Sequence, residues 1–273
     1  MNAEESAEES ADKYENLIYL ADKYENSYFL QKDPSQFMHN YASVADQEVA
    51  AFISANIAFG RRDQILLHVK AILDNAGASP AKWIKDGSFL EFFPDSDKSF
   101  YRMYSYSNMR LFCQTIRSFL LKAETLGSYF HNEYQKACLQ NNSNFPVANS
   151  GKPLLSSIIS AQFPKECPVI AKGANSACKK INMFLRWMVR DNSPVDLGLW
   201  SDWYKKTDLL MPLDTHVMQQ SVELGLLPLT AGRKAPSASL KTAIALTDTL
   251  RKIFPDDPVR ADFALFGLGV DTD

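Results

Sequence analysis

Hydrophobic residues recur every three or four positions along most of the 273-residue chain, which is the spacing of a buried helix face. No sustained alternation of hydrophobic and polar residues, the pattern of a strand, interrupts them. We therefore predict an all-α protein with two lobes. The predicted helices lie over about 46–57, 63–77, 107–127, 154–162, 179–190, from 214 onward, 240–254 and 258–267.

The turn-rich stretch NNSNFPVANSGKP at 141–153 is the strongest break in this pattern. It predicts an N-terminal helical lobe at 31–150 and a second lobe at 151–273, whose last helices could pack back on the first. Residues 1–30 are expected to form an acidic helical extension. Within it the hexapeptide ADKYEN occurs at 11–16 and again at 21–26, and two copies are too few for a solenoid.

No apolar run reaches the roughly 18 to 20 residues that span a bilayer, and the N-terminus lacks the basic and apolar regions of a signal peptide. We therefore expect a cytoplasmic protein without a membrane partner. The four cysteines form no CxxC pair, which argues against a zinc site or an iron–sulfur cluster. His39 and His216 lack ligands at zinc-site spacing, so no metal and no other cofactor is expected. His216 is then a core histidine or a support for a neighbouring site.

The charge distribution is uneven, although the net charge is only −3. Residues 1–16 carry a net charge of −5, which leaves +2 for the rest of the chain, and residues 151–190 carry +6. Such a basic stretch is typical of a solvated face or of a surface that neutralises phosphates. The acidity of the whole chain therefore does not exclude a nucleic-acid partner.

The segment CKKINMFLRWMVR at 178–190 predicts a helix that is apolar almost all round and hence central to its lobe. Lys179 and Lys180 stand at its start, where a cation is unfavourable to the helix dipole. Either the two amines reach solvent or phosphate, or one of them has a chemical role. Asp214 opens the following helix within PLDTH, where an aspartate that caps a helix contributes about 1 kcal/mol. A cap and a catalytic carboxylate can coexist on one side chain.

These segments resemble the helix-hairpin-helix base-excision DNA glycosylases. Lys179 stands six residues before Leu185-Arg186, the relation that the catalytic lysine of the archaeal 8-oxoguanine glycosylases has to a Leu-Arg pair. Asp214-Thr215-His216 is similar to that family's V-D-T-H motif. The segments NMFLRWMVR, PLDTH, FGR, DFALFGLG and an early DP followed by phenylalanine and His39 resemble more closely a bacterial family of uncharacterised helical proteins related to these glycosylases.

The resemblance implies a two-lobed glycosylase-like fold and a monomeric, nucleoid-associated glycosylase and AP lyase. It would act on double-stranded DNA that contains an oxidised purine such as 8-oxoguanine. Lys179 would form a Schiff base with the sugar and Asp214 would assist departure of the base. The alternatives are a non-catalytic nucleic-acid-binding protein and a scaffold that uses the acidic tail. The residues expected to contact DNA are Lys172, Gly173, Lys180, Arg186, Arg61 and Arg62.

Overall fold

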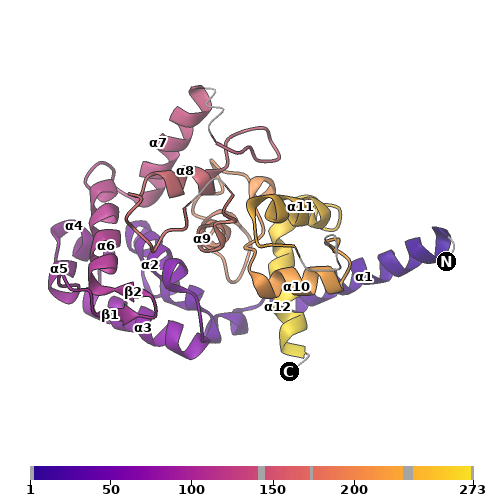
Figure 1. Ribbon diagram of the computed structural model, residues 1–273, viewed down its shortest axis with the longest axis horizontal. Coiled ribbons are helices and arrows are strands. Elements are labelled where there is room, and N and C mark those ends of the chain that lie inside the picture. Colours follow the sequence, from indigo (N-terminus) through magenta and orange to yellow (C-terminus); the bar gives the residue numbers. More distant parts are fainter. Residues whose placement is uncertain (1–2, 141–144, 173–174, 230–235, 272–273) are drawn as a thin grey trace.

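The structure is a computed structural model, and it describes residues 3–140, 145–172, 175–229 and 236–271 (Figure 1). It is predominantly helical, which confirms the all-α prediction. The part of the chain so described contains one small sheet. The α-helices are α1 (Ala3–Tyr24), α2 (Val44–Ile57), α3 (Arg62–Ala76), α4 (Pro80–Asp86), α5 (Phe89–Phe92), α6 (Tyr106–Leu120), α7 (Leu126–Leu139), α8 (Leu155–Ala161), α9 (Lys179–Val189), α10 (Thr215–Glu223), α11 (Leu240–Leu250) and α12 (Ala261–Asp271).

Short 3-10 helices and one hairpin complete the described structure. The hairpin pairs β1 (Ser99–Tyr101) antiparallel with β2 (Tyr104–Ser105), with Tyr101 opposite Tyr104. The sequence pattern missed it because two strands of three and two residues are too short to show an alternation. The 3-10 helices are η1 (Ser27–Lys32), η2 (Pro34–Asn40), η3 (Lys206–Asp208) and η4 (Pro258–Arg260).

The larger hydrophobic core surrounds α2 and α9, and it combines both halves of the chain. The Phe52 ring of α2 meets the Phe184 ring of α9 edge to face, with centroids 4.9 Å apart. Eight of the eleven residues of α9 are buried, so the prediction that this helix is central is confirmed. The predicted boundary at 141–153 does not separate two cores, because residues 155–209 contribute to the same core as residues 37–137.

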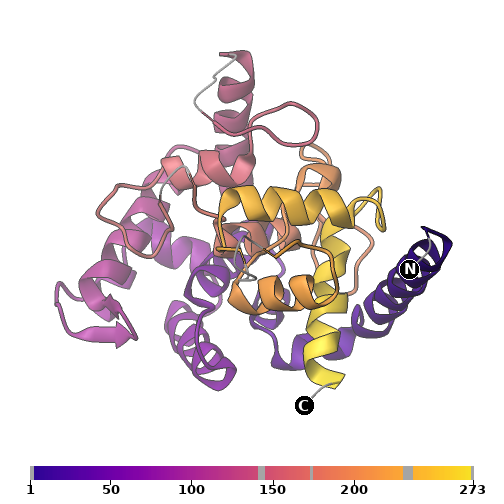
Figure 2. The same ribbon diagram turned by 45° about the vertical axis from the view of Figure 1, so that its right-hand side comes forward.

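A second core lies between α1, α10, α11 and α12. Leu17, Leu20 and Ala21 of α1 are buried in it, so the second half of α1 belongs to the folded body. Figures 1 and 2 show this half beside α12, whereas the first turns of α1 extend away from the other helices. The N-terminal extension predicted at 1–30 is helical, but it also completes a core.

The helix predicted over 107–127 is two helices, α6 and α7, which meet across a turn at 121–125. Gly127, the last residue of the predicted range, lies in the first turn of the second helix. A Cβ at Gly127 would come within 2.5 Å of both Glu48 and Trp200. This glycine therefore permits close packing. Across the described residues no helix is both long enough and apolar enough to cross a membrane.

Candidate active site

Lys179 and Asp214 are brought together by the start of α9 and the start of α10. The Lys179 Nζ lies 2.6 Å from the Asp214 Oδ2, although 35 residues separate the two in sequence. Their side chains are 36% and 35% exposed. The pairing predicted from the sequence is thus present, and a ligand can reach both groups.

Asp214 uses its two carboxylate oxygens for different purposes. Oδ1 accepts a hydrogen bond from the Val217 backbone N–H at 2.8 Å, which makes Asp214 the N-cap of α10. Oδ2 remains for the Lys179 ammonium group. Burial tends to raise the pKa of Asp214, but the Lys179 charge and the N–H groups of Val217 and His216 outweigh it and lower that pKa overall. The carboxylate therefore stays ionised at neutral pH.

The pair opens into a pocket of about 230 Å³, which we call the Lys179 pocket. Its walls come from the turn before η2, from α3, α9 and α10, and from α12, so both cores contribute. Besides the pair, its lining includes Asp33, Arg62, Met183, His216, Asp262 and Phe266. Charged groups on an apolar aromatic wall are a usual composition for a ligand site.

Asp262, Phe29 and Phe266 are among the lining residues that were not predicted as site residues. Asp262, in the first turn of α12, binds the Arg186 guanidinium, and burial raises its pKa although Arg186 acts in the opposite direction. Phe29 and Phe266 meet edge to face at 4.8 Å. Asp262 and Phe266 lie within the DFALFGLG segment. The resemblance of this segment to the bacterial helical family could have indicated both residues. Phe29 comes from η1, and no pattern in the sequence marked it.

Of the residues expected to contact DNA, Arg62 is placed at the pocket. Its guanidinium lies 5.1 Å from the Phe266 ring centroid, in a cation–π arrangement. Arg61 is exposed and pairs with Asp63. His216 is exposed and lines the pocket, so the alternative of a core histidine is wrong. Gly173 lies outside the described residues.

The other three predicted DNA contacts are engaged within the protein. The Lys172 amine donates to the backbone carbonyls of Ser160 and Phe163, near the C-terminus of α8. Arg186 is 2% exposed and lines the Lys179 pocket, and its charge is already paired with Asp196 and Asp262.

Lys180 is the third of these residues, and its amine holds three segments together. It donates to the carbonyl oxygens of Asn56 and Val169 at 2.9 and 2.5 Å, and to the Tyr104 hydroxyl at 2.6 Å. Burial lowers the pKa of Lys180 to about 8. The two neighbouring lysines therefore differ, since Lys179 faces a carboxylate in an open pocket and Lys180 faces neutral oxygens between packed segments.

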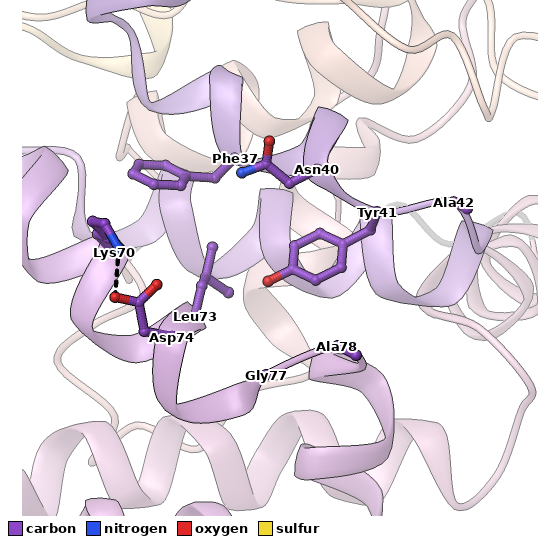
Figure 3. Close-up of a pocket in the computed structure, with 9 residues that line it drawn as sticks. All are labelled: Phe37, Asn40, Tyr41, Ala42, Lys70, Leu73, Asp74, Gly77 and Ala78. Carbon is purple, nitrogen blue, oxygen red and sulfur yellow. Dashed lines mark hydrogen bonds and ion pairs between the residues drawn. The ribbon is translucent and has the colours of Figure 1, made fainter.

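A larger cavity of about 700 Å³ lies between η2 and the end of α3 (Figure 3). Its charged groups are Lys70 and Asp74, which bind each other at 2.6 Å one helical turn apart and are both 63% exposed. Such surface pairs are common and carry no specific chemistry. The Lys179 pocket is therefore the better candidate despite its smaller volume. Among the described residues, no group of three or more His, Cys, Asp or Glu side chains could hold a metal ion.

Comparison with known protein families finds a match over most of the chain. The family described as "Protein of unknown function (DUF2400)" matches residues 33–271, which include every helix from α2 to α12. No curated protein and no solved structure matches the chain.

Proposed function

We propose that this chain, which belongs to the DUF2400 family, is a DNA N-glycosylase and AP lyase that acts through Lys179. The observation that carries the proposal is the contact of 2.6 Å between the Lys179 amine and the Asp214 carboxylate in an open pocket. An amine beside a carboxylate is what imine formation at a sugar carbon requires. The motif similarity makes double-stranded DNA containing 8-oxoguanine the first substrate to test, with a nucleoid-associated monomer acting on it.

The exposure of this pair distinguishes it from a structural salt bridge. The guanidinium groups of Arg186 and Arg190 are enclosed by carboxylates and are about 2% exposed, as expected for groups that hold helices together. Lys179 and Asp214 are each about one third exposed, with space beside them for a ligand. An incoming nucleotide can therefore reach the amine without disrupting a core.

The chemistry follows from the two groups. A proton leaves the Lys179 ammonium, and the amine lone pair forms a bond to C1′ of a flipped-out deoxyribose while the C1′–N bond to the base breaks and its electron pair leaves with the base. The nitrogen then gives up a proton, the C1′–O4′ bond breaks, O4′ takes up a proton, and a protonated imine between Lys179 and C1′ results. Loss of a C2′ proton then expels the 3′ phosphate, which cleaves the strand. Asp214 stabilises the positive charge that develops on the sugar and can take up the lysine proton.

A non-catalytic binding protein is the alternative, and it relies on the cations expected to hold phosphates. Two of these, Lys172 and Arg186, are bound to backbone carbonyls and to carboxylates. Lys172 and Arg186 therefore offer little free surface for binding a phosphate. The catalytic proposal needs neither residue to touch DNA, so it agrees better with this arrangement.

Borohydride trapping tests the proposal. Wild-type protein is mixed with duplexes that contain 8-oxoguanine or an abasic site, and borohydride reduces any imine to a stable covalent link. We expect a covalent band on a denaturing gel with wild type and none with Lys179→Gln. Lys252→Gln, an exposed lysine on the turn after α11, is the control and should trap like wild type. Absence of a band with folded wild-type protein that binds both duplexes would refute the lyase proposal.

A further inference from the structure

A second pocket, of about 470 Å³, adjoins the Lys179 pocket, and we call it the Tyr28 pocket. It lies between the end of α1, η1, the start of α3 and the last turns of α12. Phe29, Arg62 and Phe266 line both pockets. The two pockets are therefore neighbours. A DNA strand with one nucleotide in the Lys179 pocket can place an adjacent nucleotide in the Tyr28 pocket.

The two pockets differ in charge. In the Lys179 pocket the three carboxylates of Asp33, Asp214 and Asp262 are balanced by the cations of Lys179, Arg62 and Arg186. The Tyr28 pocket is lined by Lys23, Lys32 and Arg62, and none of the residues described as lining it is acidic. The lining of the Tyr28 pocket thus has three cations. They provide a local positive field for an anion such as a phosphate.

Aromatic and amide side chains complete the Tyr28 pocket. Tyr28 is 76% exposed at the rim, and the Asn26 side chain fixes the turn beneath it by accepting the Tyr28 N–H at 2.8 Å. The Phe266 ring meets Tyr24 edge to face at 6.2 Å and Phe29 at 4.8 Å. Cations next to exposed aromatic faces are the composition that binds unpaired nucleotides, in which the phosphate meets the cation and the base stacks.

The close packing of α1 on α12 keeps this wall in place. A Cβ at Gly267 would lie within 2.3 Å of the Tyr24 ring, so α12 requires a glycine where α1 crosses it. Lys23, Tyr24 and Asn26 belong to the second ADKYEN copy, at 21–26. The second copy of the hexapeptide thus forms one side of the Tyr28 pocket.

We propose that the Tyr28 pocket binds an unpaired nucleotide that flanks the reacting nucleotide on the same strand, with its base stacked on Tyr28 and its phosphate held by Lys32 and Arg62. The proposal rests on the proposed function for the position of the reacting nucleotide. It adds a substrate requirement, namely that the strand is unpaired next to the site of reaction as well as at it. The enzyme then prefers a damaged duplex that is locally opened beside the lesion over a damaged duplex that is paired there, and it binds an undamaged single strand more tightly than an undamaged duplex.

The test measures binding rather than catalysis, so Lys179 chemistry does not enter. Fluorescence anisotropy is recorded with a labelled single-stranded oligothymidylate of about twelve nucleotides that lacks damage, and with the paired duplex of the same length. Tyr28→Ala and Lys32→Gln change side chains that line the Tyr28 pocket and not the Lys179 pocket. Tyr19→Ala, a tyrosine of α1 that is 61% exposed outside the pocket, and Lys252→Gln are the matched controls.

We expect Tyr28→Ala to weaken single-strand binding about tenfold, the loss that removal of one base–aromatic stack produces. Lys32→Gln should lower the slope of log affinity against log salt by about 0.7, the contribution of one phosphate contact. Both controls should bind like wild type. Equal affinity of Tyr28→Ala and Tyr19→Ala for the single strand would overturn the proposal, as would wild-type protein that binds duplex more tightly than single strand.

The two proposals fail separately. If imine trapping succeeds but Tyr28→Ala binds like wild type, the flanking subsite is refuted and the lyase proposal stands. If trapping fails while single-strand binding depends on Tyr28 and Lys32, the subsite stands and the lyase proposal is refuted.

Discussion

At the scale of single residues, Asp214 combines a structural and a chemical role on separate oxygen atoms. Its Oδ1 caps α10 and its Oδ2 holds Lys179. An asparagine at this position keeps an acceptor for the cap but loses the negative charge. The two roles can therefore be separated by a pair of substitutions.

We expect Asp214→Asn to lower the free energy of unfolding by about 1 kcal/mol or less, because asparagine caps a helix as well as aspartate and only the part-exposed ion pair with Lys179 is lost. The same substitution should slow borohydride-trapped imine formation by about 10²- to 10⁴-fold, the usual contribution of a group that assists proton transfer. Asp214→Ala should lose the same activity and about 1 kcal/mol more stability than Asp214→Asn. Urea denaturation and single-turnover trapping measure the two effects. Near wild-type trapping by Asp214→Asn would show that the carboxylate only caps.

Neighbouring lysines differ in a way that sequence alone could not resolve. The pattern placed both Lys179 and Lys180 at the start of one helix, and that position is correct. Successive residues of an α-helix are rotated by about 100°, so the two amines point to different surroundings. Distant segments of the chain form those surroundings. Asn56, Tyr104 and Val169, which bind Lys180, are unrelated to it in sequence.

At the scale of elements, Lys180 joins the end of α2, the β1–β2 hairpin and the segment before α9. We expect Lys180→Met to lower the free energy of unfolding by about 1–3 kcal/mol at neutral pH, since buried acceptors lose their donor. The loss should depend on pH. Burial lowers the pKa of Lys180 from 10.5 to about 8 in the folded protein. Between these values the unfolded chain keeps a proton that the folded chain has released, so the stability that Lys180 contributes rises with pH.

The advantage of wild type over Lys180→Met should thus be larger at about pH 9.5 than at about pH 7. Urea denaturation at both pH values measures it, and the other titrating groups cancel because both proteins contain them. Lys165→Met, at an exposed lysine, is the control and should show no such dependence. A difference that stays constant or shrinks as the pH rises would contradict burial of the amine.

Helix positions were largely predictable, whereas helix junctions were not. The spacing of Val49, Phe52 and Ile53 predicts a buried helix face, and all three residues are buried in α2. Gly127 shows the limit of the approach, because glycine is common at helix ends and rare inside them. Because Gly127 has no side chain, Glu48 and Trp200 can approach the first turn of α7. The Gly127 N–H donates a hydrogen bond to the Glu48 carboxylate at 2.9 Å. That contact joins residues 79 positions apart, and no local pattern contains it.

At the scale of the whole molecule, buried ion pairs join the N-terminal helix to the helix that carries Lys179. Arg190, at the end of α9, donates to Asp196, to Asp257 before η4 and to Glu25 just after α1. Arg186, one turn earlier, pairs with Asp262 at the Lys179 pocket. In the sequence, both arginines lie in the basic stretch at 151–190. They are buried because the nearby Asp196 and acidic residues from two distant segments, Glu25 and the stretch at 257–262, converge on them.

Arg190 is therefore expected to be among the most costly residues to remove. Arg190→Ala leaves the carboxylates of Glu25, Asp196 and Asp257 without their shared cation, and breaking a buried network of this kind costs about 3–5 kcal/mol. That is a large part of the roughly 5–15 kcal/mol by which a folded domain is stable. Arg190→Lys should recover only part of the loss, because an ammonium group lacks the planar fork that reaches several carboxylates at once.

Arg260 supplies the matched control for this prediction. It also binds Glu25, and it binds Asp22, but its side chain is 31% exposed. Arg260 is partly hydrated, and Glu25 keeps Arg190 as a partner when Arg260 is removed, so Arg260→Ala should cost about 1 kcal/mol and be mild by comparison. Urea unfolding followed by both tryptophan fluorescence and circular dichroism gives the two free energies. If Arg190→Ala and Arg260→Ala were equally mild, the carboxylates around Arg190 would have to be hydrated or protonated, and the coupling of α1 to the Lys179 helix would not depend on this cation.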